Sequence, residues 1–361
     1  MSLTSPFALV LSGGGLKGLA HIGTFRAIEE AGLTPSMVVG TSMGALIAAT
    51  WATGMSVAEM EERAVAIRRK DVFRVAHADM AFRRMKAPAI YRREPLEELI
   101  HSLVGDRTFN DLEHRLVVNT VDLNSGMQVL WGMPGLMDVR VADAVFGACA
   151  LPGVFPPQEI AGRHFVDGAV VDNLPIRAAA ASGPTAILAV DLGSSGVLRS
   201  EIEESGFAAT YVRGLEIVMQ TLVVNSLATW TQPPVLLVRP RVERIGMFAF
   251  DQTKELLEEG YRATRDLLNR YSEGFEHRTG GIYPKRKVTI SVDEARCIGC
   301  TTCVALAPQV FRMNDEGKAE VIAPEQQWSP LDGRYIWNCP TYAIGAHPVT
   351  APKPGEATTA P

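Results

Sequence analysis

Residues 7–44 read FALVLSGGGLKGLAHIGTFRAIEEAGLTPSMVVGTSMG, and the class of fold can be inferred from these residues. Two short apolar runs, Phe7–Leu11 and Met37–Val39, each lead into a loop rich in glycine. Apolar residues at helical spacing follow the first loop over residues 16–31, and small residues at 45–52 follow the second. A strand, a tight loop and a helix therefore occur twice in succession. This pattern predicts a mostly parallel sheet with helices on both faces.

Further strands are predicted downstream, and helical stretches separate most of them. Their ranges are 115–121, 127–130, 164–166, 186–190 and 235–238. We therefore expect a three-layer α/β/α domain over residues 5–271. A polar, glycine-containing linker at 272–284 precedes a compact module at 285–347. The tail at 348–361 is rich in Pro, Ala and Thr, and we expect it to be disordered.

Composition and charge narrow the class of protein. The chain has 361 residues, with 35 Lys and Arg against 40 Asp and Glu, and a formal net charge of −5. A mildly acidic protein lacks the positive field that general nucleic-acid binding requires. No stretch reaches about 18 consecutive apolar residues, and the N-terminus has no basic region or long apolar run typical of a signal peptide. We therefore expect a soluble cytoplasmic protein.

The first glycine-rich loop has two possible functions. Gly13, Gly14, Gly15 and Gly18 fit the G-x-G-x-x-G spacing between a strand and a helix, which can hold a pyrophosphate. A dinucleotide site also needs an acidic residue about 20 residues further on, and residues 37–42 contain none. The same arrangement of backbone N–H groups can instead form an oxyanion hole.

The second glycine-rich loop favours the oxyanion hole. Gly40-Thr41-Ser42-Met43-Gly44 is G-x-S-x-G between a strand and a helix, the context of a nucleophile elbow. Gly40 and Gly44 are needed because a Cβ at either position would clash in the strained turn. The N-terminus of the following helix stabilises negative charge that develops near Ser42.

A nucleophilic serine needs a base. His277 lies in the expected linker and His347 at the edge of the tail, so neither is well placed. Asp167 begins Asp167-Gly168-Ala169 directly after a predicted strand, and strand ends are where such sheets present catalytic groups. A carboxylate has an ordinary pKa of about 4 and is a weak base unless a shielded pocket changes it. An isolated Asp-Gly is otherwise an ordinary turn.

The combination of G-G-G-x-K-G, G-T-S-M-G and D-G-A, in this order, resembles the patatin-like phospholipase family over residues 5–270. Ala150–Pro157 and Asn173-Leu174-Pro175 also match its bacterial members. The resemblance implies acyl-ester hydrolysis, mostly of lipids, by a Ser42–Asp167 dyad. It also implies an oxyanion hole at Gly13, Gly14 and Gly15, and motif positions at Gly18, Gly40, Gly44, Gly168 and Ala169.

Four of the five cysteines form a second motif. Cys297, Cys300, Cys303 and Cys339-Pro340 have the spacing C-x2-C-x2-C…C-P, which places thiolates around an iron–sulfur cluster. Zinc also accepts four thiolates, but its usual pattern is two C-x2-C pairs. The module resembles small bacterial ferredoxins, and Ala307 stands where two-cluster ferredoxins carry a further cysteine. One [4Fe–4S] cluster is therefore implied, and with it a possible redox partner.

One segment of the predicted hydrolase domain is strongly basic. Residues 63–93 contain ten basic and two acidic residues. A solvated helical face is one interpretation. The other is a patch that binds anionic lipid at the inner membrane surface, carried by Arg83, Arg84 and Lys86.

The sequence thus predicts a serine acyl-ester hydrolase of the phospholipase A type, fused to an iron–sulfur module for electron transfer or redox sensing. Two alternatives stay open. One is an electron-transfer protein whose hydrolase domain is a docking platform, and the other is an esterase or thioesterase that acts on non-lipid substrates.

Overall fold

The computed structural model describes residues 6–75, 89–193, 206–246, 250–271 and 280–349. Its contacts divide the chain into two compact units, Met1–Gly281 and Ile282–Pro361. The basic residues Arg83, Arg84 and Lys86 lie outside the described residues, as do His277 and most of the expected linker and tail. No helix in the described part of the chain is both long enough and apolar enough to cross a membrane.

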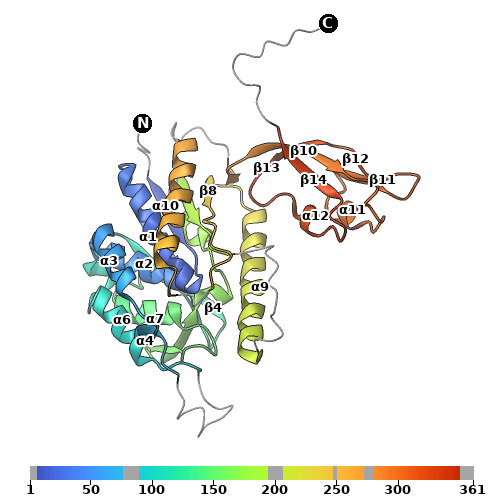
Figure 1. Ribbon diagram of the computed structural model, residues 1–361. Coiled ribbons are helices and arrows are strands. Elements are labelled where there is room, and N and C mark those ends of the chain that lie inside the picture. The colour runs from blue at the N-terminus through green and yellow to red at the C-terminus, as the bar shows by residue number, and fades with distance from the viewer. Residues whose placement is uncertain (1–5, 76–88, 194–205, 247–249, 272–279, 350–361) are drawn as a thin grey trace. The chain divides into compact units, whose positions relative to one another are not determined.

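The larger unit is built on a mixed sheet with a parallel centre (Figure 1). Its order is β5-β6-β3-β2-β1-β7-β8, and β4 also pairs with β3. The pairings among β3, β2, β1, β7 and β8 are parallel, whereas β4, β5 and β6 pair in antiparallel fashion. The strands are β1 (Phe7–Leu11), β2 (Met37–Thr41), β3 (Leu116–Asp122), β4 (Met127–Trp131), β5 (Gln158–Ile160), β6 (Arg163–Asp167), β7 (Ala186–Val190) and β8 (Val235–Val238).

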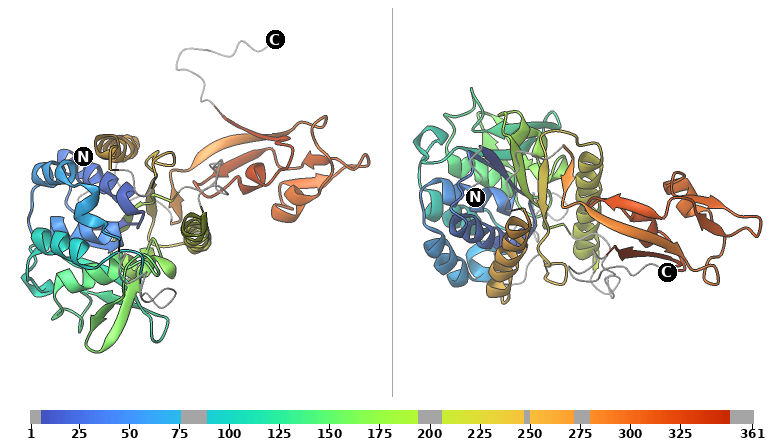
Figure 2. Two further views of the ribbon diagram at one scale, coloured as in Figure 1. Left: turned by 60° about the horizontal axis from the view of Figure 1, so that its bottom comes forward. Right: turned by 90° about the horizontal axis from the view of Figure 1, so that it is seen from above.

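Every residue of the five parallel strands is buried, because helices cover both faces of the sheet. Figure 2 shows α1 and α10 on one side of the sheet and α9 on the other. The predicted three-layer α/β/α class is confirmed. The helices are α1 (Ala20–Glu30), α2 (Met43–Ala52), α3 (Val57–Ala66), α4 (Arg69–Val72), α6 (Glu94–Val104), α7 (Val141–Cys149), α8 (Ile176–Ala180), α9 (Gly206–Ala228) and α10 (Thr253–Arg270).

The described residues also form three short 3-10 helices. They are η1 (Gly15–Leu19), η3 (Phe109–Asp111) and η4 (Gly168–Val170). The single helix expected over residues 16–31 is therefore divided into η1 and α1. The tighter first turn places Gly14 and Gly15 at the end of β1, where they adjoin the second glycine-rich loop.

The smaller unit begins with the two-residue strand β9 (Ile282–Tyr283), within the segment that the sequence analysis assigned to the linker. It contains the antiparallel sheet β13-β10-β14 and the hairpin β11-β12. Phe311, Trp328 and Tyr335 pack at its core, next to the buried Cys297 and Cys303. The remaining elements are β10 (Arg286–Val292), α11 (Thr302–Leu306), β11 (Phe311–Met313), β12 (Ala319–Val321), β13 (Glu325–Trp328), α12 (Arg334–Trp337) and β14 (Ile344–Pro348).

Candidate active site

Ser42 occupies a sharp turn between β2 and α2. Its φ of 55° lies in the left-handed region, which residues other than glycine rarely adopt. The neighbouring glycines make the turn possible. A Cβ on Gly40 would lie 2.5 Å from Cα of Ala45, and a Cβ on Gly44 would lie 2.5 Å from the carbonyl oxygen of Leu11. The two glycines therefore allow Ser42 to adopt the strained backbone conformation of a nucleophile elbow.

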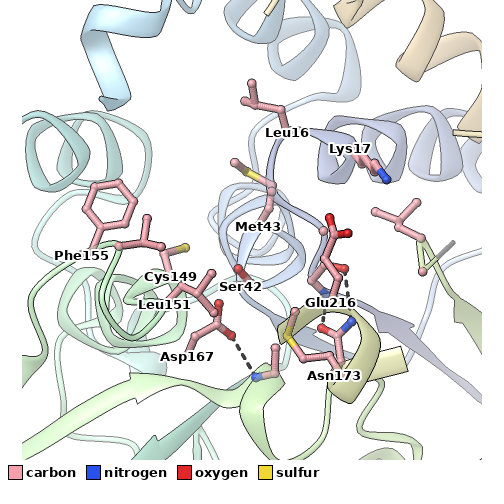
Figure 3. A pocket seen from close by; sticks show the side chains of 18 of the residues that line it. Leu16, Lys17, Ser42, Met43, Cys149, Leu151, Phe155, Asp167, Asn173 and Glu216 are labelled. Carbon is pink, nitrogen blue, oxygen red and sulfur yellow. Dashed lines mark hydrogen bonds between the residues drawn. The ribbon is translucent and has the colours of Figure 1, made fainter. Parts of the chain in front are cut away.

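Asp167 is the last residue of β6, and its side chain points toward Ser42 (Figure 3). The residue is 2% exposed, and its Oδ1 accepts a hydrogen bond of 2.9 Å from the Ala169 N–H. Burial raises the pKa of the Asp167 carboxyl to about 7, although hydrogen bonds from Ala169 and the Ser42 side chain oppose the rise. A carboxylate with this pKa is a much stronger base than an exposed one, and it lies beside a serine hydroxyl.

A buried asparagine holds the loop that carries Asp167 against the sheet. Asn119 of β3 donates hydrogen bonds from Nδ2 to Thr41 Oγ1 at 3.1 Å and to the backbone oxygen of Asp172 at 2.7 Å. Gly168 is required at this contact, since a Cβ there would lie 2.5 Å from Asn119 Cγ. Sequence reasoning did not select Asn119. Its one signal was a polar residue at the centre of an apolar strand.

The first glycine-rich loop lies against the nucleophile, but its three glycines differ. The Gly13 N–H donates to Asn173 Oδ1 at 2.9 Å, and Asn173 Nδ2 donates back to the Gly13 oxygen at 3.4 Å. The amide of Gly13 is therefore occupied, contrary to the expectation that all three glycines form the oxyanion hole. Gly14 and Gly15 precede and begin η1, where backbone N–H groups have no acceptor within the helix.

No described histidine lines the cavity around Ser42. His21 is fully buried near the loop, and burial lowers the pKa of its imidazole to about 4, although a hydrogen bond with the Ser12 carbonyl oxygen opposes this. It is therefore neutral and contributes to the structure of the loop. His347 belongs to β14 in the smaller unit. Cys149 does line the cavity, but desolvation raises its thiol pKa, and the negative charge of Asp167 raises it further.

The cavity encloses about 980 Å³ of empty space, part of it open to solvent, and its two sides differ in chemistry. In Figure 3, Leu151 and Phe155 lie on one side of Ser42, whereas Lys17 and Glu216 lie on the other. Sequence reasoning missed the residues that α9 contributes, because nothing in a helix sequence shows which strand ends it faces. They are Glu216, Met219 and Gln220.

The four cysteines of the smaller unit line one cavity. The Ala319 N–H lies 3.5 Å from Cys297 Sγ, and the Ala343 N–H lies 3.3 Å from Cys339 Sγ. Such N–H donors stabilise thiolates that bind iron. Within the described ranges, no three His, Cys, Asp or Glu side chains are grouped closely enough to hold a single metal ion. A shared cavity lined by four thiols, with amide donors to the sulfurs, nevertheless fits a cluster.

Comparison with known proteins identifies the two parts separately. Residues 9–180 match the model of the patatin-like phospholipase family, and residues 292–346 match the 4Fe-4S single cluster domain of ferredoxin I. An uncharacterized NTE family protein of Mycobacterium tuberculosis is 26% identical over 278 residues, which cover 72% of this chain and 46% of that protein. Lysophospholipase NTE1 of Mycosarcoma maydis is 28% identical over 283 residues, covering 72% of this chain and 14% of that protein.

This chain spans about half the length of the mycobacterial relatives it matches. Among solved structures, VipD from Legionella pneumophila aligns with a TM-score of 0.42 at 14% identity, covering 74% of this chain and 67% of VipD. The type III effector ExoU aligns with a TM-score of 0.43 at 16% identity, covering 77% of this chain and 54% of ExoU. By sequence, residues 9–180 are therefore similar to the patatin-like phospholipase family, and residues 292–346 are similar to the 4Fe-4S single cluster domain of ferredoxin I.

Proposed function

We propose that the protein is a lipid acyl hydrolase of the phospholipase A type, with Ser42 as nucleophile and Asp167 as base. The observation that carries the proposal is a serine in a strained turn facing a buried carboxyl whose pKa is about 7. The family match and the lysophospholipase name of the fungal relative support the reaction class. The apolar side of the cavity supports an acyl ester as substrate.

The reaction follows from the positions of these groups. The Ser42 Oγ attacks the acyl carbonyl carbon while its proton moves to the Asp167 carboxylate. The N–H groups of Gly14 and Gly15 stabilise the resulting oxyanion. Asp167 then returns the proton to the departing alcohol, and the acyl group stays on Ser42. A water molecule, deprotonated by Asp167, attacks this ester, and the released proton returns to Ser42 as the fatty acid leaves.

Labelling with a fluorophosphonate probe tests the dyad directly. We expect covalent labelling of the wild-type protein at Ser42 and none of Ser42→Ala. Asp167→Asn should label at least about 100-fold more slowly, because general-base assistance contributes about this much or more. Asp172→Asn is a matched control, since Asp172 is a neighbouring acid whose pKa burial raises to about 6, and it does not line the cavity. Normal labelling of Asp167→Asn would assign the base to another residue.

We also propose that Cys297, Cys300, Cys303 and Cys339 hold one [4Fe–4S] cluster, which supplies one-electron transfer when bound. The sulfurs of Cys297 and Cys339 already accept N–H donors of the protein, and all four thiols face one cavity. Iron and acid-labile sulfide, measured after anaerobic purification, should both approach four per chain for this cluster type. Zinc without sulfide would exclude the cluster. Cross-linking of the reduced protein would then identify the protein with which it exchanges electrons.

Membrane association is a separate proposal that rests on sequence alone. Binding to vesicles that contain anionic lipid should weaken when the basic residues are changed to Gln, while hydrolysis of a soluble ester is unchanged. The residues are Arg83, Arg84 and Lys86. Equal loss of vesicle binding and soluble-ester hydrolysis would instead indicate a structural role for this segment.

A further inference from the structure

In the smaller unit, two of the four cysteines are followed by a threonine two residues later. The pairs are Cys300 with Thr302 and Cys339 with Thr341. Cys300 is exposed and Cys339 is half-buried, whereas the other two cysteines of this unit are buried. The two threonines therefore accompany the two sulfurs that are more accessible to solvent.

The hydroxyl of Thr341 lies within reach of the Cys339 sulfur. Thr341 Oγ1 is 3.7 Å from Cys339 Sγ, a hydrogen-bonding distance for sulfur. A thiolate that binds iron carries no proton, so the hydroxyl is then the donor. Burial raises the pKa of the Cys339 thiol, but hydrogen bonds from Ala343, Thr341 and Ile344 outweigh it, and the pKa is lowered. The protein thus surrounds this sulfur with donors, and the side-chain donor among them belongs to Thr341.

A turn that contains a proline brings this hydroxyl to the sulfur. Pro340 has no N–H group, so it offers the neighbouring sulfur no donor. The Tyr342 N–H donates to the Cys339 carbonyl oxygen at 3.1 Å and closes a turn over these four residues. Thr341 is half-buried at the third position of the turn. Because the turn fixes the position of Thr341, a substitution that keeps the shape of its side chain changes little except the hydroxyl.

A similar contact occurs at Cys300, where water competes with it. The side chain and the N–H of Thr302 hydrogen-bond the Cys300 sulfur, and both lower the pKa of its thiol. Since Cys300 is exposed, a water molecule can replace the hydroxyl when it is removed. In the part of the smaller unit that the structure describes, Cys303 has only backbone donors, and Cys297 accepts from the Ala319 N–H. The hydroxyl donors thus serve the two accessible sulfurs.

We propose that the hydroxyl of Thr341 makes the cluster easier to reduce, and that Thr302 adds a smaller effect of the same sign. The inference rests on the proposed [4Fe–4S] cluster. Uptake of one electron from a one-electron donor adds one negative charge to the iron, sulfide and thiolate atoms, and no proton is transferred. A hydrogen bond to a more negative acceptor is stronger. The hydroxyl therefore stabilises the reduced form more than the oxidised form, and its removal lowers the reduction potential.

Replacing each hydroxyl by a methyl group tests the inference in the full chain. In Thr341→Val, we expect the equilibrium between the two forms to shift about tenfold toward the oxidised cluster, which is about 59 mV for one electron. Thr302→Val should shift it by less than about threefold, because water replaces the hydroxyl. Anaerobic titration with dithionite, followed by electron paramagnetic resonance of the reduced cluster, measures the midpoints. Thr341→Ser keeps a hydroxyl and should stay within about twofold of wild type.

A control and a second variant complete the test. Thr301→Val should leave the midpoint unchanged, since Thr301 is exposed beside Cys300 and its side chain makes no capping hydrogen bond. Thr341→Ala removes the hydroxyl without placing a methyl group beside the sulfur, and it decides the question if Thr341→Val does not fold. Midpoints equal to wild type in these Thr341 variants, with about four iron atoms per chain in each protein, would overturn the inference and leave the cluster proposal intact. Wild-type protein without iron would refute both.

Discussion

Replacing Asp167 with Asn should make the protein more stable and less active. Asp167 is 2% exposed, and burial raises its carboxyl pKa from 3.8 to about 7, against the opposing hydrogen bonds from Ala169 and Ser42. Compared with the unfolded chain, the folded protein therefore disfavours the carboxylate relative to the neutral carboxyl by about 4 kcal/mol. Asparagine keeps the size of the side chain and an oxygen that accepts the Ala169 N–H, but it carries no charge.

The direction of the pH dependence follows from proton binding. Between about pH 4 and about pH 7, Asp167 holds its proton in the folded state and has lost it in the unfolded state. The free energy of unfolding therefore falls as pH rises through this interval and stays lower above it. Asp167→Asn avoids this loss. We expect its free energy of unfolding to equal that of wild type below about pH 4 and to exceed it by up to about 4 kcal/mol above about pH 7.

Two assays check the reasoning. Denaturant unfolding at low and high pH should show the predicted stabilisation of Asp167→Asn, and a smaller one in Asp172→Asn, since burial raises the pKa of Asp172 only to about 6. In wild type, kcat/KM for a short-chain ester should rise with pH to a half-maximum near about 7, and the variant should lose about 10²- to 10⁴-fold. A wild-type midpoint near about pH 4, the ordinary range of a carboxyl, would refute the account. So would a variant that gains no stability at high pH.

Three further predictions concern other parts of the two sites. Asn173→Ala removes both side-chain hydrogen bonds to Gly13, so we expect steady-state kinetics to show a kcat that is lower by about tenfold or more, with KM little changed. An effect on KM alone would contradict a role of Asn173 in the oxyanion loop. The Cys300→Ala protein should contain no iron and should lack the visible absorbance of the cluster, whereas the Cys149→Ala protein, changed in the other unit, should keep both. Equal iron content in the two variants would contradict the assignment of Cys300 as a ligand. Gly44→Ala should lower the free energy of unfolding by several kcal/mol, as measured by denaturant titration, because the new Cβ meets a backbone oxygen. An unchanged denaturation midpoint would mean that the turn at Ser42 can relax to accept the Cβ.

The features of this protein that depend on short-range geometry were predictable from its sequence. The turn at Ser42 needs glycine at two fixed positions, and a strand and a helix flank it in the sequence as in the structure. The spacing of Cys297, Cys300 and Cys303 likewise limits which sites these thiols can form. Regular elements followed from the period of apolar residues, and β7 and β8 have the predicted bounds. Steric and covalent constraints of this kind act over a few residues, so the sequence displays them.

The chemical properties of the active site depend instead on contacts between segments that are distant in the sequence. The pKa of Asp167 depends on burial by segments distant in sequence, and the Gly13 amide is occupied by Asn173, which lies 160 residues further along the chain. Part of the polar side of the catalytic cavity comes from α9, which lies far along the chain from both glycine-rich loops. Desolvation and cavity shape depend on every atom that packs around a point. They are therefore properties of the assembled fold, which no local pattern in the sequence encodes.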